Sequence, residues 1–326
     1  LKSINKWDNT HLLVIGDTIV DQYAACEPIG LSAEAPVVVV KELQKKDFIG
    51  GAAIVASHIK ALGAKCTFLS VTGDDYLSDF VYKKLNSSGI NTVLIKDKSR
   101  PTTFKKRYVV ENQKLFRVSK LEDHNLHKEK EDLLILKLRE LAKNVKGIVV
   151  SDFVYGVITP NILEKINQLS VKYNLKVFGD LQCSSQVGSI TKFKNFSFLS
   201  PNEREARIAL HEKELDLEAL SNRIHSKSNS KMLIMKLGSN GFIAYDFNDE
   251  KTMNQPFPAL SINPIDVTGA GDSLLAVMAV GLSSNQKMMP SAAIACCMTA
   301  LAVEQMGNKP IRKEALIDFI QKRIHL

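Results

Sequence analysis

The chain has 326 residues, of which 45% are hydrophobic and 24% are charged, and its formal net charge is +8. This is the composition of an ordinary globular protein, with ample chain to bury a sizeable core. The lysines are spread along the sequence without a long basic run interleaved with aromatic residues, which argues against a nucleic-acid partner.

Apolar runs and amphipathic segments alternate from the first strand onward. A short apolar run that stops at Gly16-Asp17 predicts a buried strand, and Gly50-Gly51 precedes an amphipathic helix that ends at Gly63. This βαβ rhythm predicts a parallel sheet with helices on its faces. The predicted elements are strands at 11–16 and 35–43, a helix from 52 to about 63, a strand at 66–73 and a helix at 74–89.

Two strand-like stretches, 102–110 and 113–118, then interrupt the rhythm, with Glu111-Asn112 between them as a hairpin turn. We expect the strands near 18–45 and 98–120 to stand apart as a small β lid on one domain, 1–326. The rhythm resumes with a helix at 127–144, a strand at 147–153, a helix from about 160, strands at 176–181 and 196–202, helices at 203–210 and near 215–227, a hairpin at 232–246, and two apolar helices after Gly271 that finish the chain.

The strongest chemical signal is DVTGAGD at 266–272, directly before the apolar helix SLLAVMAVGL. Two glycines at a helix entrance let backbone N–H groups converge on one point, where the helix N-terminus also favours an anion. Asp272 is well placed there to accept a proton from a hydroxyl. The alternative is a plain glycine-rich loop capped by an Asp. A dinucleotide-binding reading is weaker, because the third glycine of GxGxxG would fall on Leu274.

Other catalytic motifs are missing from the sequence: there is no P-loop GxxxxGK[ST], no protein-kinase HRD…DFG set and no zinc-binding HExxH. DVTGAGD resembles the signature of the PfkB/ribokinase family of sugar kinases, and the resemblance runs from about residue 11 to residue 310. Singly, the other matching pieces could be a turn, a helix cap or a hairpin loop. They follow the family's order, however, and are Gly16-Asp17 with Asp21, Gly50-Gly51, Asn202 with Glu205, and Lys236 with Gly238 and Gly241.

The resemblance implies a ribokinase-like three-layer α/β/α sandwich with a mostly parallel central sheet and a small β-strand lid. It also implies ATP-dependent phosphorylation of a sugar or sugar phosphate hydroxyl, with Mg²⁺ as cofactor, and a homodimer formed through the lid strands. The implied catalytic residues are Asp272 as base, with Gly269, Ala270 and Gly271 as an anion hole. The implied substrate-binding residues are Asp17, Asp21, Gly50, Gly51 and Asp152, with Arg107 and Arg117 for a substrate phosphate.

The resemblance assigns the nucleotide to Asn202, Lys236, Gly238, Gly241 and Thr268. It assigns Mg²⁺, held through water, to Asn202 and Glu205, and a monovalent cation, K⁺, to Asp266 beside Thr268. For Arg107 and Arg117 the alternative is surface charge on a lid strand.

Within the family, the closest resemblance is to kinases of D-glycero-β-D-manno-heptose 7-phosphate, the kinase half of the bifunctional heptose enzyme. It is carried by GDTIVDQY, LSAEAPVVVV, PTTFKKRYVVENQKLFR and VVSDFVYG. Three sites depart from that pattern: Ile54 replaces an Asn, Tyr155 a Lys, and Gln182-Cys183 a Lys-Gly pair. A kinase of another sugar phosphate or of a nucleoside, and a catalytically idle binding protein of the same fold, are the alternatives.

Cysteine spacing and apolar runs predict the cellular setting. The five cysteines form no CxxC pair and no Cys/His ligand spacing, which predicts free thiols in a reducing cytoplasm. The N-terminus has no apolar signal-peptide core, and the most apolar stretches, 274–282 and 292–303, are shorter than a membrane span. We therefore expect a cytoplasmic protein without a membrane partner.

Overall fold

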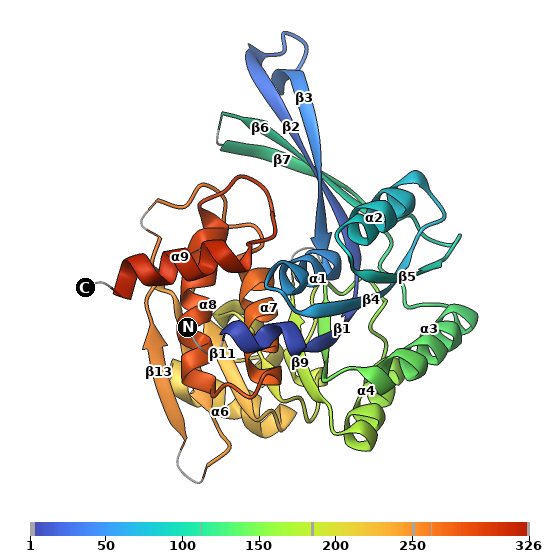
Figure 1. Ribbon diagram of the computed structural model, residues 1–326. Helices are drawn as coiled ribbons and strands as arrows, with labels where there is room; N and C mark the ends of the chain where they lie inside the picture. The colour runs from blue at the N-terminus through green and yellow to red at the C-terminus, as the bar shows by residue number, and fades with distance from the viewer. Residues whose placement is uncertain (1–3, 112, 184–185, 250–251, 262, 325–326) are drawn as a thin grey trace.

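Two β-sheets organise the chain, one in the body of the molecule and one that projects from it (Figure 1). The computed structural model describes residues 4–111, 113–183, 186–249, 252–261 and 263–324. The central sheet has the order β13-β12-β11-β10-β9-β8-β1-β4-β5 and is parallel from β11 to β5, whereas β12 and β13 are antiparallel. Its strands are β1 (His11–Gly16), β4 (Lys65–Thr72), β5 (Asn91–Lys96), β8 (Gly147–Asp152), β9 (Lys176–Leu181), β10 (Phe198–Leu199), β11 (Met232–Lys236), β12 (Phe242–Asp246) and β13 (Met253–Phe257).

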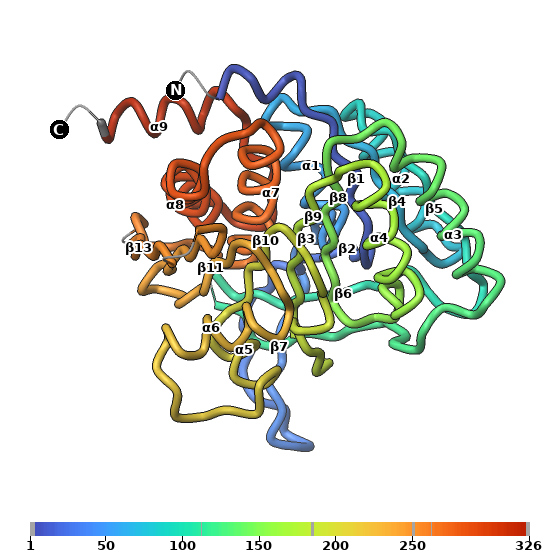
Figure 2. The backbone as a smooth tube through the Cα atoms, turned by 90° about the horizontal axis from the view of Figure 1, so that it is seen from below, coloured from blue at the N-terminus to red at the C-terminus, as the bar shows by residue number. Residues whose placement is uncertain are grey.

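Both faces of the central sheet are buried, which explains why its strands are apolar throughout rather than alternating. In β1, Leu12 and Val14 join the core on one face, and Leu13 and Ile15 join the core on the other. The first core is covered by α1 (Ala52–Ala61), α2 (Tyr76–Ser87), α7 (Ala270–Ser283), α8 (Met288–Val303) and α9 (Lys313–Ile324). The second is covered by α3 (Lys128–Leu141), α4 (Pro160–Tyr173), α5 (Glu203–Leu210) and α6 (Leu217–Ser228). Figure 2 shows the three layers from below.

The projecting sheet, here called the lid sheet, consists of β2 (Thr18–Leu31), β3 (Val38–Gly51), β6 (Thr103–Val110) and β7 (Gln113–Lys120). Its order is β3-β2-β6-β7, with β2 and β6 parallel at the centre and the two outer pairs antiparallel. β2 leaves the central sheet directly after β1, and β3 returns to it at α1. The lid is therefore anchored at the carboxyl end of a central strand.

Short 3₁₀ helices complete the described structure, at Ile4–Asn9, Ala142–Asn144, Ile190–Lys192 and Gly238–Asn240. Among the described residues, none of the helices combines the length and apolar character needed to cross a bilayer.

The predicted three-layer fold with a separate small sheet is confirmed, and its details need four corrections. The strand predicted at 35–43 runs from Val38 to Gly51 instead, and Gly51 is also the N-cap of α1, so the predicted helix start is confirmed. β5 was missed, and so was β13, an edge strand that contains Pro256 and lacks a buried apolar run. A third helix, α9, follows the two apolar ones, because its polar face hid the pattern of buried Leu316 and Ile320. In the predicted turn at Glu111-Asn112, residue 112 lies outside the described residues.

Candidate active site

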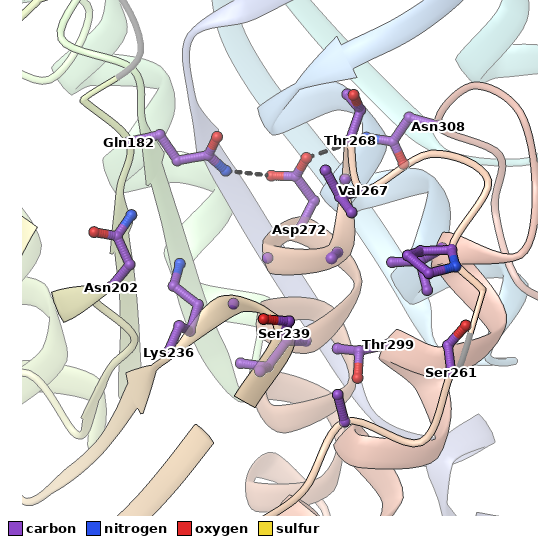
Figure 3. Close-up of a pocket in the computed structure, with 18 of the residues that line it drawn as sticks. Gln182, Asn202, Lys236, Ser239, Ser261, Val267, Thr268, Asp272, Thr299 and Asn308 are labelled. Atoms are coloured by element: carbon purple, nitrogen blue, oxygen red, sulfur yellow. Dashed lines mark hydrogen bonds between the residues drawn. The ribbon is translucent and has the colours of Figure 1, made fainter. Parts of the chain in front are cut away.

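A pocket of about 740 Å³ opens where the carboxyl ends of the central strands meet the lid sheet and the start of α7. In parallel α/β sheets this edge is the usual place for ligands, because loops from several strands converge there. Figure 3 shows how Gln182, directly after β9, Lys236 of β11 and Asp272 of α7 point into the pocket. The candidate site residues predicted from the sequence follow several of these strands, and the strand order of the sheet places them side by side.

The Asp272 carboxylate lies in the first turn of α7, is 4% exposed and lines the pocket. Each of its oxygens accepts one amide hydrogen bond: Oδ1 from Gln182 Nε2 at 2.9 Å and Oδ2 from Asn308 Nδ2 at 3.1 Å (Figure 3). Burial, together with the nearby Asp180 carboxylate, raises the pKa of Asp272 to about 7 although Lys236 and Asn308 oppose the shift. An Asp with this pKa is matched to proton transfer near neutral pH.

The loop before Asp272 requires its glycines. Gly269 is the N-cap of α7 and has φ of 87°, in the left-handed region that favours glycine. A Cβ at Gly269 would come within 2.2 Å of the Asn308 side chain, so the space is closed as well. The first N–H groups of a helix have no intrahelical partner, and the residues at this helix start, 269–271, line the pocket beside Asp272. The 269–272 loop can therefore receive a negatively charged group.

On the β11 side, Lys236 lines the pocket and donates to Asp180 Oδ1 at 2.8 Å. A Cβ at Gly271 would lie 3.2 Å from the Lys236 ammonium, which places this cation against the 269–272 loop. Burial alone would lower the pKa of Lys236, but the carboxylates of Asp180 and Glu205 outweigh it and raise the pKa. Lys236 thus remains a fixed positive charge at the pocket wall. Gly238 and Gly241 line the same side.

Asn202 and Glu205 form a capping box at the start of α5. The Asn202 side chain accepts from the Glu205 N–H at 2.8 Å, and Glu205 Oε2 accepts from the Asn202 N–H at 2.9 Å. Both residues also line the pocket, so the predicted helix cap and the predicted pocket role coincide. A carboxylate has about four lone-pair positions, so Glu205 keeps acceptor capacity for water after accepting from Asn202 and Cys183. The residues present fit a Mg²⁺ ion held through water.

At the lid, three cations line the pocket: Lys105 and Arg107 from β6, and Arg117 from β7. Arg107 forms a close ion pair with Asp21, and Gly50 is packed so tightly against Asp21 that a Cβ there would lie 2.3 Å from Oδ2. Among the described residues that line this end, three are cationic and one, Asp21, is acidic. Lys105 also lies over the Phe153 ring at 5.3 Å, which anchors the lid end to the body.

A model of the pfkB family of carbohydrate kinases matches residues 9–314 of the chain. The chain belongs to this family. As a carbohydrate kinase it uses ATP, and the family implies a divalent metal as well.

Individual relatives of this carbohydrate kinase agree with the family match. The chain is 32% identical over 311 residues to the bifunctional protein HldE of Campylobacter jejuni, covering 94% of this chain and 64% of that protein. This supports the predicted resemblance to the bifunctional heptose enzyme. Two solved structures share the fold: phosphofructokinase-2 of Escherichia coli (TM-score 0.79, 14% identity, 96% of this chain and 99% of that chain) and ribokinase of Thermotoga maritima (TM-score 0.73, 19% identity, 96% and 99%).

Most of the predicted residues of the kinase line one pocket, but four do not. Lining residues are Asp21, Gly51, Arg107, Arg117, Asn202, Glu205, Lys236, Gly238, Gly241 and 268–272. Gly50 backs Asp21, while Asp17 and Asp152 lie buried behind the wall, where burial and the Asp152 charge raise the pKa of Asp17 to about 7. Asp266 is buried just before the loop, and each oxygen of its carboxylate accepts two hydrogen bonds from the protein.

Sequence reasoning missed three residues that the kinase brings to its site. Asp180 and Lys105 had signals: Asp180 lies near the end of a predicted strand, and Lys105 is two residues from Arg107, so both share one face of β6. Asn308 follows α8 in a loop, and nothing in its local sequence points to the contact with Asp272. Of the departures from the heptose-kinase pattern, Gln182 lies in the pocket, whereas Ile54 is 1% exposed and is not among the lining residues.

Proposed function

We propose that this kinase transfers the γ-phosphoryl group of ATP to a hydroxyl of a phosphorylated sugar, with Asp272 as the general base. One observation carries the proposal: the Asp272 carboxylate, with its pKa raised to about 7, lies in the pocket between the cationic lid end and the Lys236 wall. Such a carboxylate accepts the proton of an attacking hydroxyl at the entrance of a helix that favours an incoming anion.

In the proposed mechanism, the acceptor hydroxyl donates to Asp272 and attacks the γ-phosphorus in line. The proton moves to Asp272 as the new P–O bond forms and the bond to the leaving oxygen of ADP breaks. N–H groups of the 269–272 loop stabilise the transferring phosphoryl oxygens, and Lys236 adds a fixed positive charge nearby. Gln182 and Asn308 hold the carboxylate in position. Mg²⁺, held through water by Asn202 and Glu205, would neutralise charge on the phosphates.

The rest of the β11 wall is assigned to the nucleotide. Gly238 has φ of 60° and no atom within 4 Å of a Cβ built on it, so the loop after β11 leaves open space beside the pocket. Gly241 and Thr268 line the same pocket. We assign the triphosphate to the side formed by Lys236, Gly238 and the 268–272 segment, which leaves the lid end for the sugar.

The cationic lining of the lid end supports a sugar that already carries a phosphate. Lys105, Arg107 and Arg117 line this end together with Asp21, and cationic side chains of this kind are suited to binding a phosphate group. The similarity to HldE favours a heptose 7-phosphate as this substrate. The chain spans 64% of the length of that relative, so this substrate is a proposal for the kinase alone.

Two alternatives keep specific support. Gln182 stands where a Lys is expected and bonds the proposed base directly, which favours a kinase of another sugar phosphate or of a nucleoside. An idle binding protein is the other alternative, but an intact base, loop and capping box in one pocket favour a working enzyme.

The deciding experiment measures ADP formation against a panel of sugars, sugar phosphates including heptose 7-phosphate, and nucleosides. We expect turnover on a phosphorylated sugar, and a loss of about 10²–10⁴ in kcat for Asp272→Asn, the usual contribution of a general base. Asp132→Asn, which changes an exposed Asp of α3, is the control. Full activity of Asp272→Asn would show that Asp272 is not the general base. Binding of MgATP without turnover on any acceptor would favour the idle protein.

The outer side of the lid sheet supports a homodimer. Phe116 and Val118 are 49% and 53% exposed, and they flank Arg117, whose side chain lines the pocket, so they lie on the opposite face of β7. Val38 of β3 is 59% exposed at the other edge. An apolar face on exposed edge strands is a liability unless it is covered, and a second copy of this chain would cover it. Light scattering should show Phe116→Glu as a monomer and the control Val171→Glu, on α4, as a dimer.

A further inference from the structure

Every lone-pair position of the Asp266 carboxylate is taken by a donor from the protein. Oδ1 accepts from Lys114 Nζ at 2.7 Å and from the Thr268 N–H at 3.0 Å. Oδ2 accepts from Tyr23 OH at 2.8 Å and from the Gly307 N–H at 3.1 Å. The side chain of Asp266 is 1% exposed, so water does not compete for it. A carboxylate offers about four such positions, and here all four are used.

The strongest of these donors comes from the lid sheet. Lys114 lies near the start of β7, and its ammonium also donates to Thr268 Oγ1 at 2.9 Å. Thr268 directly precedes Gly269, so the ammonium contacts two residues, Asp266 and Thr268, of the segment that leads into the 269–272 loop. Burial alone would raise the pKa of Asp266, but the hydrogen bonds from Lys114, Thr268 and Tyr23 outweigh it and lower the pKa to about 2. Asp266 is therefore ionised throughout the neutral range.

The monovalent cation that the family resemblance implies does not fit this arrangement. A cation beside Asp266 needs free carboxylate or carbonyl oxygens, and both carboxylate oxygens are already doubly occupied. The Val303 carbonyl, which faces the same segment, accepts from the N–H groups of both Ile265 and Asp266. The positive charge at this point is instead a side chain of the protein.

Resting on the proposed kinase activity, we infer that Lys114 is a tethered cation that takes the place of a monovalent metal ion and positions the 269–272 loop. Its ammonium neutralises Asp266 and fixes Thr268 at the loop entrance. Because Lys114 is carried by β7, the loop is held only while the lid strand is docked. Lid position and loop geometry are thereby linked through one contact. The wild-type enzyme should not respond to K⁺.

The test compares Lys114→Ala with Lys114→Met. Ala empties the space beside Asp266 and Thr268, whereas Met fills it with an uncharged chain of similar length. We expect kcat of both variants to fall by about tenfold or more in choline chloride, the effect of losing a charge-assisted contact. K⁺ or NH₄⁺ should restore Lys114→Ala by about fivefold or more and leave Lys114→Met unchanged, because only the first has room for an ion. Lys120→Ala, at the exposed end of the same strand, is the control and should match the wild type.

A second readout does not depend on turnover. The melting temperature of each protein is measured in KCl and in choline chloride at equal ionic strength, without substrate. We expect K⁺ to stabilise Lys114→Ala alone. Strong K⁺ activation or stabilisation of the wild type would overturn the inference, and so would a loss in Lys114→Ala that no cation restores. If no acceptor in the panel is phosphorylated, the proposed function fails, while the melting data still decide whether Lys114 replaces an ion.

Discussion

The two ends of the pocket differ in the part of the chain that forms them, the main chain at one end and side chains at the other. At the transfer end, the 269–272 loop, the α5 capping box and the β11 loop hold the site mainly with main-chain geometry and glycines. At the lid end, long cationic side chains from two paired strands, Lys105, Arg107 and Arg117, form the wall.

This difference indicates which properties each end controls. A site made of backbone tolerates almost no change, since a glycine with positive φ or a closed contact has no substitute. A site made of strand side chains can exchange one charge for another without disturbing the fold. The transfer end should therefore determine the rate of the chemical step, and the lid end the choice of acceptor.

Gly269→Ala should break the transfer end most severely. The new Cβ would lie 2.2 Å from Asn308 at a φ of 87°, so the loop, Asn308 or both must move. Displacing the loop and a partner of the base should lower kcat by about 10²-fold or more, in the range seen when one transition-state donor is lost. Gly89→Ala is the control, because Gly89 also has positive φ but a Cβ there would meet only the end of the Lys60 side chain. This variant should be about 1 kcal/mol less stable than the wild type and keep full activity. Steady-state kinetics and thermal melting separate the two; equal kcat in both variants would contradict the prediction.

Asn308→Asp should change the pH dependence. The proposed base, Asp272, accepts a proton only when it is ionised, so kcat/KM should rise with pH through about 7. The substitution removes the N–H that stabilises the Asp272 carboxylate and adds a negative charge beside it, and both effects raise the pKa of Asp272. The acid limb should move up by about one unit or more, which is a tenfold loss below pH 7 and recovery near pH 9. A pH profile with an unchanged limb and a lower plateau would show that Asn308 acts otherwise.

The residues of the transfer end could be predicted from the sequence because short-range sequence patterns form them. The glycine loop, the Asn202–Glu205 cap and the strand ends are short-range patterns, and the three-layer fold follows from the βαβ rhythm. Contacts between distant segments carried no such signal. Asn308 reaches Asp272 from the loop beyond α8, and Lys114 reaches Asp266 across 152 residues. The missed elements have a similar cause: β13 is an edge strand with a proline, and α9 buries only a narrow stripe.

Lys105→Met, at the lid end, should have the smallest effect of these variants, and the effect should be confined to binding of the acceptor. Lys105 is 3% exposed and lines the pocket, so Lys105→Met removes one positive charge beside a phosphorylated acceptor and keeps a side chain of similar length. KM for the sugar phosphate should rise about threefold to tenfold, the effect of one lost charge-assisted contact. KM for ATP and kcat should hardly change, because the transfer end is untouched.

The neighbouring Lys106→Met is the matched control for this variant. Lys106 is the next residue along β6, pairs with Glu42 and is not among the lining residues. The substitution therefore removes the same charge from the other face of the strand. Its KM values should equal those of the wild type. The unphosphorylated sugar is the second control, and Lys105→Met should leave its KM unchanged. If Lys105→Met raised KM equally for both sugars, the lid end would recognise hydroxyl groups and not a phosphate.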